Sequence, residues 1–159
     1  MAGLNRDAAL YDVMDAEANA ALEKRGDCRF DESALNVNAL FAGSRSDPSA
    51  RGSIQNISED NFTPVNFITG FLDGIAGELY NLYLPVKKKG AVFKNLIGGG
   101  NGIRKNRPLR RILAEKFEMP LRIPIYQEEG AYVAALFALT RTGYFKNVFR
   151  AQQLVSYED

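Results

Sequence analysis

Histidine is absent from this 159-residue sequence. Its absence excludes Ser-His-Asp and Cys-His catalysis, and it excludes zinc sites built on imidazole ligands. A general base in this chain would therefore be a carboxylate, a lysine or a tyrosine. Cysteine is nearly absent too. Cys28 has no partner for an internal disulfide, which agrees with a reducing compartment, and it has no sequence neighbour that would activate its thiol.

Long apolar runs and an excess of one charge are also missing. No stretch reaches the roughly 20 apolar residues that a membrane-spanning helix needs, and residues 1–6 contain no apolar core of signal-peptide length. The formal net charge is +1, and the apolar share of 46% is ordinary for a globular domain. We therefore expect a cytoplasmic chain with no membrane partner and no overall attraction to nucleic acid.

The first third of the chain predicts one helix followed by turn-rich structure. Residues 6–24 form an amphipathic pattern, with Asn5 or Asp7 as a candidate N-cap and Gly26 as the end. Its apolar face comprises Leu10, Val13, Met14, Ala18, Ala21 and Leu22. Short strands are expected within residues 35–41 and 53–57, and the Gly-, Ser-, Asp- and Pro-rich residues between them predict a loop.

The clearest helix starts at Thr63 and Pro64, a good cap followed by a residue that suits the first helical position. Its apolar stripe comprises Ile68, Phe71, Leu72, Ile75, Leu79 and Leu82. Glycines cost about 1 kcal/mol each in a helix relative to alanine, so Gly70, Gly74 and Gly77 predict close packing against another backbone. Pro85 and the basic run that follows it should end the helix.

The second half alternates between strands and helices. A buried strand is expected at 91–97, a helix from Asn106, an edge strand at 121–125 and a helix that starts at Glu128 and Glu129. The predicted buried face of the Asn106 helix comprises Leu109, Ile112, Leu113 and Phe117, and the predicted packing face of the last helix comprises Ala131, Ala134, Ala135, Ala138 and Leu139. This order predicts an α/β fold with some parallel pairing. The tail after Gly143 mixes apolar and polar residues in a pattern that predicts no particular element.

A glycine-rich turn joins the strand at 91–97 to the next helix. It consists of Gly98, Gly99, Gly100, Asn101 and Gly102. Glycines allow a sharp turn with positive φ and let a flat ligand lie on the main chain, and the start of a helix offers N–H groups to a phosphate. Arg104 and Lys105 would add positive charge. A plain strand-to-helix turn remains an alternative, because the segment matches neither common phosphate-loop motif.

Three segments together resemble the FGGY carbohydrate kinases, in particular their sedoheptulokinase-like members. Residues 41–54, with Asp47-Pro48 and Ala50-Arg51-Gly52, resemble a turn of that family. Residues 97–106 resemble its adenosine motif, and residues 124–138 resemble the alanine-rich helix that follows. The resemblance implies the C-terminal lobe of an actin-like, ribonuclease-H-like ATPase fold over 1–159, with a leading helix and loop at 1–34, a family-matching core at 35–142 and a tail at 143–159.

The resemblance also implies a function for this lobe. It would hold ATP by its adenosine, with Gly99, Gly100 and Asn101 against the nucleoside, Gly98 and Gly102 shaping the turn, and Asn106 assisting. These site residues are Gly98, Gly99, Gly100, Asn101, Gly102 and Asn106. The catalytic residue and most Mg²⁺ ligands would belong to the N-terminal kinase lobe, which has no counterpart here, so the chain should be inactive alone. The acceptor would be a ketose such as sedoheptulose.

One departure from the family lies in the last helix, where Val133 stands at a usual glycine. If the core cannot adjust, the extra side chain would cost roughly 1–3 kcal/mol and weaken ATP binding.

Other readings stay open. Arg45 and Asp47 are candidate contacts to the sugar. Asp47 is also a candidate general base, although a turn cap is the simpler role, and Arg45 and Arg51 could either reach the sugar or form ion pairs within the loop. A basic cluster could contact nucleic acid, but a solvated helix face is the simpler interpretation; it comprises Arg104, Lys105, Arg107, Arg110 and Arg111. A non-catalytic nucleotide-binding or interaction module is the alternative function, and an exposed half-cleft would allow a homodimer.

Overall fold

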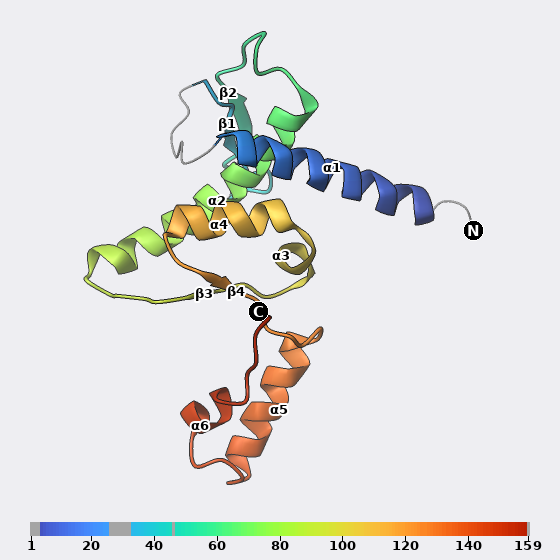
Figure 1. Ribbon diagram of the computed structural model, residues 1–159. Helices are drawn as coiled ribbons and strands as arrows, with labels where there is room; N and C mark the ends of the chain where they lie inside the picture. The colour runs from blue at the N-terminus through green and yellow to red at the C-terminus, as the bar shows by residue number, and fades with distance from the viewer. Residues whose placement is uncertain (1–3, 26–32, 46, 159) are drawn as a thin grey trace. The chain divides into compact units, whose positions relative to one another are not determined.

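The computed structural model describes residues 4–25, 33–45 and 47–158, with the backbone alone for 4–8. The expectations for Gly26 and Cys28 lie outside these ranges. The chain divides into two compact units, Met1–Val92 with Asn106–Glu118, and Phe93–Lys105 with Met119–Asp159. We call them the first and the second unit. Both contain helices and short strands, so the chain has an α/β composition (Figure 1).

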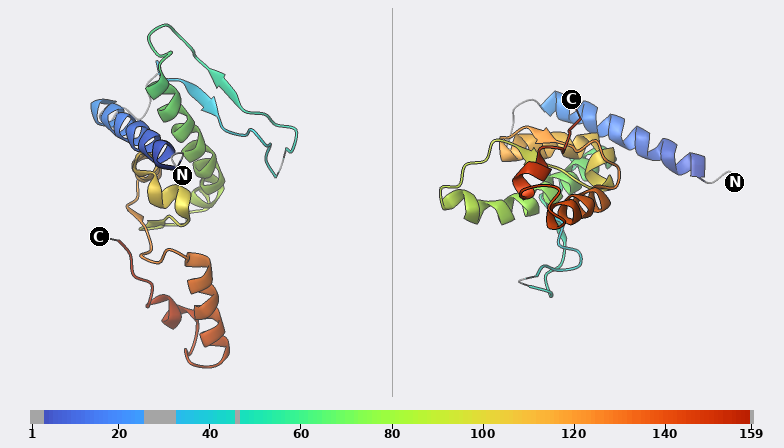
Figure 2. Two further views of the ribbon diagram at one scale, coloured as in Figure 1. Left: turned by 90° about the vertical axis from the view of Figure 1, so that its right-hand side faces the viewer. Right: turned by 90° about the horizontal axis from the view of Figure 1, so that it is seen from below.

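In the described residues, the first unit contains three helices and a hairpin. They are α1 (Leu4–Arg25), β1 (Asn36–Asn38), β2 (Ser53–Gln55), α2 (Pro64–Lys88) and α4 (Arg107–Phe117). The two strands are antiparallel, with Val37 opposite Ile54. The hairpin lies along α2, and α1, α2 and α4 contact one another (Figure 2). Both predicted strands and the loop between them are confirmed.

Helix α2 begins as expected but ends later. The Thr63 side chain accepts a hydrogen bond from the Asn66 N–H, and Pro64 is the first helical residue. The helix ends at Lys88, within the basic run that was expected to end it, but the prediction for Pro85 is wrong because α2 continues through that residue. Proline removes one bond to the carbonyl four residues earlier, and Asn81 and Pro85 are both exposed, so water can satisfy that carbonyl.

Two of the three α2 glycines pack against β1. A Cβ on Gly74 would lie 2.5 Å from the Val37 carbonyl oxygen, and one on Gly70 would lie 3.1 Å from Val37 Cγ2. The expected close approach to another backbone is therefore confirmed for Gly74, whereas the nearest neighbours of Gly70 are side-chain atoms of Val37 and Leu35, at 3.1 and 3.3 Å. Gly77 differs, because a Cβ there would meet only Lys116 Nζ, at 3.9 Å.

Helix α4 supplies much of the core of the first unit. Asn106 caps it, since its Oδ1 accepts a hydrogen bond from the Leu109 N–H at 2.8 Å. Glu118 ends it in the left-handed conformation, with φ 55°. The predicted buried face is confirmed; it consists of Leu109, Ile112, Leu113 and Phe117.

Helix α1 is buried along only part of its length. Ala18 and Leu22 are 0% and 4% exposed, whereas Leu10 and Val13 are both 58% exposed. The predicted apolar face is therefore buried only in its C-terminal half, because a 22-residue helix is about 33 Å long and its partners cover only one end. Asn5 and Asp7 do not cap the helix, since it already includes them.

The second unit contains a parallel strand pair and three helices. They are β3 (Leu96–Ile97), α3 (Asn101–Lys105), β4 (Leu121–Arg122), α5 (Glu129–Arg141) and α6 (Val148–Gln152). Leu96 pairs with Leu121, which confirms parallel pairing. The strands are shorter than expected. The prediction of a buried strand from residue 91 is wrong, because Val92 is 88% exposed and the strand starts at Leu96.

Helix α5 starts at Glu129 with Glu128 in the cap position, as predicted. The expectation of tight packing along its alanines is wrong for the described structure: Leu136 is its one buried residue, whereas Ala131, Ala134, Ala135, Ala138 and Leu139 are exposed. The pattern identified apolar positions, but burial also needs a partner surface. In the described residues, α5 contacts α6, the short helix of the unassigned tail.

None of the helices in the described ranges combines the length and the apolar composition that crossing a bilayer requires.

Candidate functional site

The glycine turn follows β3 directly, and its first residue is part of the packing. Gly98 is buried, and its N–H donates a hydrogen bond to the Arg122 carbonyl at 3.0 Å. A Cβ there would lie 2.8 Å from Ile103 Cγ2 and 3.0 Å from Ile123 Cδ1. Gly98 therefore lets the turn close onto β4 and α3, and its backbone is not on the surface.

The next residues of the turn form an open surface. Gly99, Gly100, Asn101 and Gly102 are all exposed. A Cβ on Gly100 or Gly102 would meet no atom within 4 Å, and Gly100 has a φ of +88°, which favours glycine. The side chains of the described chain therefore do not fill the space above these glycines.

The helix that follows the glycines is α3, a single short helix that the sequence did not reveal. The expected helix from Asn106 is α4, one element later. Asn106 therefore belongs to the first unit, whereas Gly98, Gly99, Gly100, Asn101 and Gly102 belong to the second. The Asn106 side-chain oxygen is engaged in capping α4.

Glu129 lies beside the turn, a position that the sequence analysis missed. Its Oε1 accepts a hydrogen bond from the Gly100 N–H at 3.4 Å. A Cβ on Gly99 would lie 4.0 Å from the Glu129 carboxyl carbon. The sequence indicated only that Glu129 would favour the start of a helix. Its contact with a turn 29 residues away depends on the path of the chain through β4.

Arg104 holds this carboxylate in place. Its Nη2 donates to Glu129 Oε1 at 2.5 Å and to the carbonyls of Pro124 and Tyr126, both at 2.7 Å, while Nη1 donates to Glu158 at 2.9 Å. The Arg104 side chain is only 14% exposed. Its charge is thus directed at two carboxylates within the second unit. Arg104 therefore does not add positive charge for a phosphate, as the sequence had suggested.

The same contacts set the ionisation of Glu129. The hydrogen bond from Arg104 is the largest cause, and backbone N–H groups including that of Gly100 add to it. Together they lower the pKa of the Glu129 carboxyl below its usual value, against the opposing effect of partial burial. Glu129 is therefore a carboxylate at neutral pH.

The second predicted group, Arg45 and Asp47, lies in the exposed loop between β1 and β2 of the first unit. Asp47 Oδ1 accepts hydrogen bonds from the N–H and the hydroxyl of Ser49 at 2.9 and 2.6 Å, and these bonds lower the pKa of Asp47. This geometry is that of a turn residue. Arg51 donates to the carbonyls of Pro48 and Ala50.

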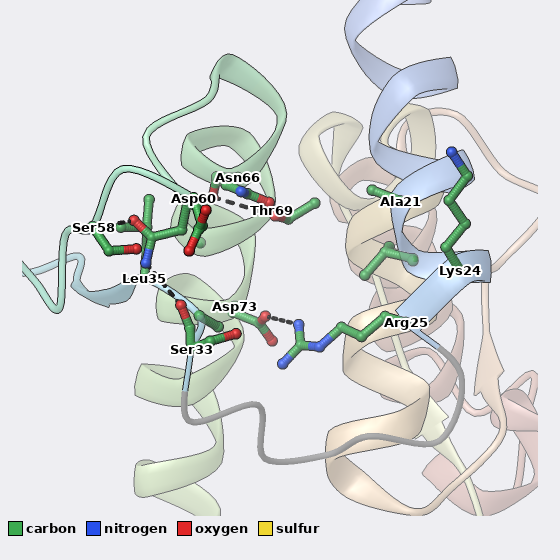
Figure 3. A pocket seen from close by; sticks show the side chains of 14 residues that line it. Ala21, Lys24, Arg25, Ser33, Leu35, Ser58, Asp60, Asn66, Thr69 and Asp73 are labelled. Carbon is green, nitrogen blue, oxygen red and sulfur yellow. Dashed lines mark hydrogen bonds and ion pairs between the residues drawn. The ribbon is translucent and has the colours of Figure 1, made fainter.

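The first unit also contains a polar cavity of about 370 Å³ (Figure 3). It is lined by the end of α1, the residues before β1, residues 58–61 and the first half of α2. Arg25 reaches across to Asp73, at 2.6 Å, and Lys116 lies 3.8 Å from the same carboxylate. None of the predicted site residues lines this cavity.

The basic cluster is divided between the two units. Arg104 pairs with Glu129 and Glu158, and Arg111 pairs with Glu115 at 2.8 Å. Ion pairs of this kind reduce the positive potential that a nucleic acid would meet. Among the described residues, no three His, Cys, Asp or Glu side chains gather closely enough to hold a metal ion.

Comparison with solved structures shows similarity to sugar and glycerol kinases. Xylulose kinase from Rhodospirillum rubrum matches with a TM-score of 0.74 at 19% identity, over 100% of this chain and 30% of that protein. Xylulose kinase from Bifidobacterium adolescentis gives 0.59 at 22% identity, over 75% and 23% of the two chains. Plasmodium falciparum glycerol kinase with ADP gives 0.64 at 20% identity, over 96% and 30%.

The present chain thus covers between 23% and 30% of the length of these relatives. A search of curated protein sequences found no match. The sequence profile of the FGGY family of carbohydrate kinases, C-terminal domain, matches residues 2–141. The predicted fold, a C-terminal lobe of the actin-like ATPase type, is confirmed. The chain belongs to the FGGY family of carbohydrate kinases and represents its C-terminal domain.

Proposed function

We propose that this chain is the ATP-side lobe of a sugar kinase, and that the exposed glycine turn of the second unit carries the adenosine. The single observation that carries this proposal is the open space above Gly100 and Gly102. A flat, uncharged group can lie on such a backbone surface because no Cβ projects from it. The glycerol kinase that this chain resembles was solved with ADP, which supports a nucleotide as the ligand.

The residues of the turn would have different roles in nucleotide binding. Gly99, Gly100 and Asn101 would lie against the nucleoside, while Gly98 and Gly102 give the turn its shape, and Asn106 would assist through its amide nitrogen. The phosphates would extend away from this turn, because the Gly100 N–H already faces the Glu129 carboxylate. Bound ATP would supply the phosphoryl group for transfer to a sugar hydroxyl.

The rest of the reaction would depend on groups outside this chain. We infer a partner lobe that supplies the general base and most Mg²⁺ ligands, so residues 1–159 would be inactive alone. Arg45 and Asp47 would face the sugar. The acceptor would be a ketose such as sedoheptulose, and closure of the two lobes would exclude water from the transfer. A cytoplasmic location accords with this activity.

A reconstitution experiment tests the proposal. ATP and a panel of ketoses are added to the chain alone and to the chain co-expressed with the first lobe of a family member. We expect ADP formation only in the pair. Nucleotide binding without turnover in either sample would favour the non-catalytic module, and no binding in either sample would overturn the nucleotide assignment.

A variant of the turn links the activity to this surface. Gly102→Leu adds a side chain on the open face in helical backbone where nothing lies within 4 Å, so it should block the nucleoside without strain. Gly77→Leu is the matched control, since its nearest neighbour would be the flexible tip of Lys116. Gly102→Leu should lower nucleotide affinity about tenfold or more, whereas Gly77→Leu should leave it unchanged; equal effects would contradict the site.

A further inference from the structure

We propose that Glu129 determines what the glycine turn accepts: its carboxylate receives hydrogen bonds from the donor groups of a nucleoside and keeps phosphate groups off the turn. This inference rests on the proposed function and adds a residue and a chemical preference to it. The preferred ligand is an uncharged group with hydroxyl or amino donors, such as ribose or the amino group of adenine.

The Glu129 carboxylate lies beside the exposed glycine turn. The Gly100 N–H is a backbone donor on the exposed turn, and it points at Glu129 Oε1, 3.4 Å away. The carboxyl carbon lies 4.0 Å from where a Gly99 Cβ would be. The acid therefore stands at the edge of the open glycine surface. A phosphate at the same N–H would have to displace this carboxylate or bear its repulsion.

Arg104 holds the Glu129 carboxylate in one position. Arg104 fixes Oε1 and is itself tied to two backbone carbonyls and to Glu158. Arg104, Glu129 and Glu158 together carry a formal charge of −1, so this cluster does not attract an anion. The bonds from Arg104 and Gly100 both end at Oε1, and Oε2 retains acceptor capacity for a ligand.

The chemical consequence is a preference for donors. A hydrogen bond to a charged acceptor contributes more than one between neutral groups. A fixed carboxylate beside a bare backbone surface therefore favours a ligand whose flat part lies on the glycines and whose hydroxyl or amino group reaches the acid. Adenosine combines both features, whereas inorganic tripolyphosphate has neither.

Ligand analogues test this without any substitution. The backbone amide signals of Gly99, Gly100 and Gly102 are followed by nuclear magnetic resonance in the ¹⁵N-labelled chain, alone and with the first lobe. Adenosine and ATP should shift these signals, and tripolyphosphate should not. Either 2′-deoxyadenosine, which lacks a ribose donor, or purine riboside, which lacks the amino group, should bind about tenfold more weakly, and the weaker analogue identifies the donor.

Substitution of Glu129 provides a second test of the same inference. Glu129→Gln keeps the shape and removes the charge, and Glu128→Gln is its matched control because Glu128 makes no side-chain cap bond. Glu129→Gln should lose the discrimination between adenosine and the weaker analogue and should allow tripolyphosphate to shift the turn signals. Glu128→Gln should behave as the parent chain does.

The outcomes separate the two proposals. If neither adenosine nor ATP shifts the turn signals in either sample, the proposed function fails and this inference fails with it. If adenosine binds at the turn but both analogues bind equally well, or tripolyphosphate shifts the parent's signals as strongly as ATP, the role of Glu129 is overturned while the nucleotide site stands. Even if Glu129→Gln does not fold, the analogue series still tests whether the turn prefers hydrogen-bond donors to phosphate.

Discussion

Gly74 of α2 lies so close to β1 that a Cβ on it would stand 2.5 Å from the carbonyl oxygen of Val37. Gly74→Ala should therefore destabilise the first unit by about 1–3 kcal/mol, as overpacking does, even though alanine favours a helix by about 1 kcal/mol over glycine. Urea unfolding followed by circular dichroism measures the change. Gly77→Ala, where a Cβ has room, should instead raise the free energy of unfolding.

Two substitutions of Asn106 distinguish its role as a helix cap from its proposed role in nucleotide binding. Its Oδ1 caps α4 through the Leu109 N–H, so Asn106→Ala should lower stability by about 1 kcal/mol. Asn106→Asp keeps an acceptor for the cap but removes the amide nitrogen. This variant should retain the unfolding free energy and lose nucleotide affinity if the amide assists binding; unchanged affinity would restrict Asn106 to capping.

The two ends of α1 should respond differently to substitution. Leu22→Ala removes a buried side chain, 4% exposed, and should cost about 2–5 kcal/mol. Leu10→Glu changes a residue that is 58% exposed and should shift stability by no more than about 0.5 kcal/mol. The midpoint of urea unfolding distinguishes them. A large loss in Leu10→Glu would mean that the N-terminal half of α1 has a partner in solution.

The sequence predicted those elements whose signals are local. The caps of α2 and α4 are examples, because a cap depends on residues three positions apart, as in Thr63 with Asn66 and Asn106 with Leu109. The sequence also predicted the apolar face of α4 correctly. The two-residue strands β3 and β4 are too short for a period-two pattern to set their bounds, and α3 is hidden by the glycine at its second position.

Long-range features could not be obtained in this way. Apolar residues on α1 and α5 were identified correctly, but their burial depends on partner surfaces that a period of 3.6 residues does not reveal. Glu129 illustrates the same limit at the site. Its type and position indicated a helix start, whereas its hydrogen bonds to Gly100 and Arg104 join residues 25 to 29 positions apart.

The Arg104–Glu129 pair predicts a specific dependence of stability on pH. The pKa of Glu129 in the folded chain lies below the ordinary value of 4.5, chiefly because of the hydrogen bond from Arg104. Between those two values the unfolded chain binds more protons than the folded chain, so stability falls as pH falls. The contribution of the pair is complete above pH 4.5 and is lost as the pH drops towards the folded pKa.

Comparison of the parent chain with Glu129→Gln isolates this contribution, because Asp47, whose pKa is also lowered, titrates in both proteins. Urea unfolding of the second unit, followed through its amide signals at pH 7, 5, 4 and 3, gives the difference in unfolding free energy. That difference should be constant at the two higher values and shrink at the two lower ones. Glu128→Gln should show no such change relative to the parent. A difference between the parent and Glu129→Gln that persists unchanged at pH 3 would mean that the ionised pair does not stabilise the folded second unit.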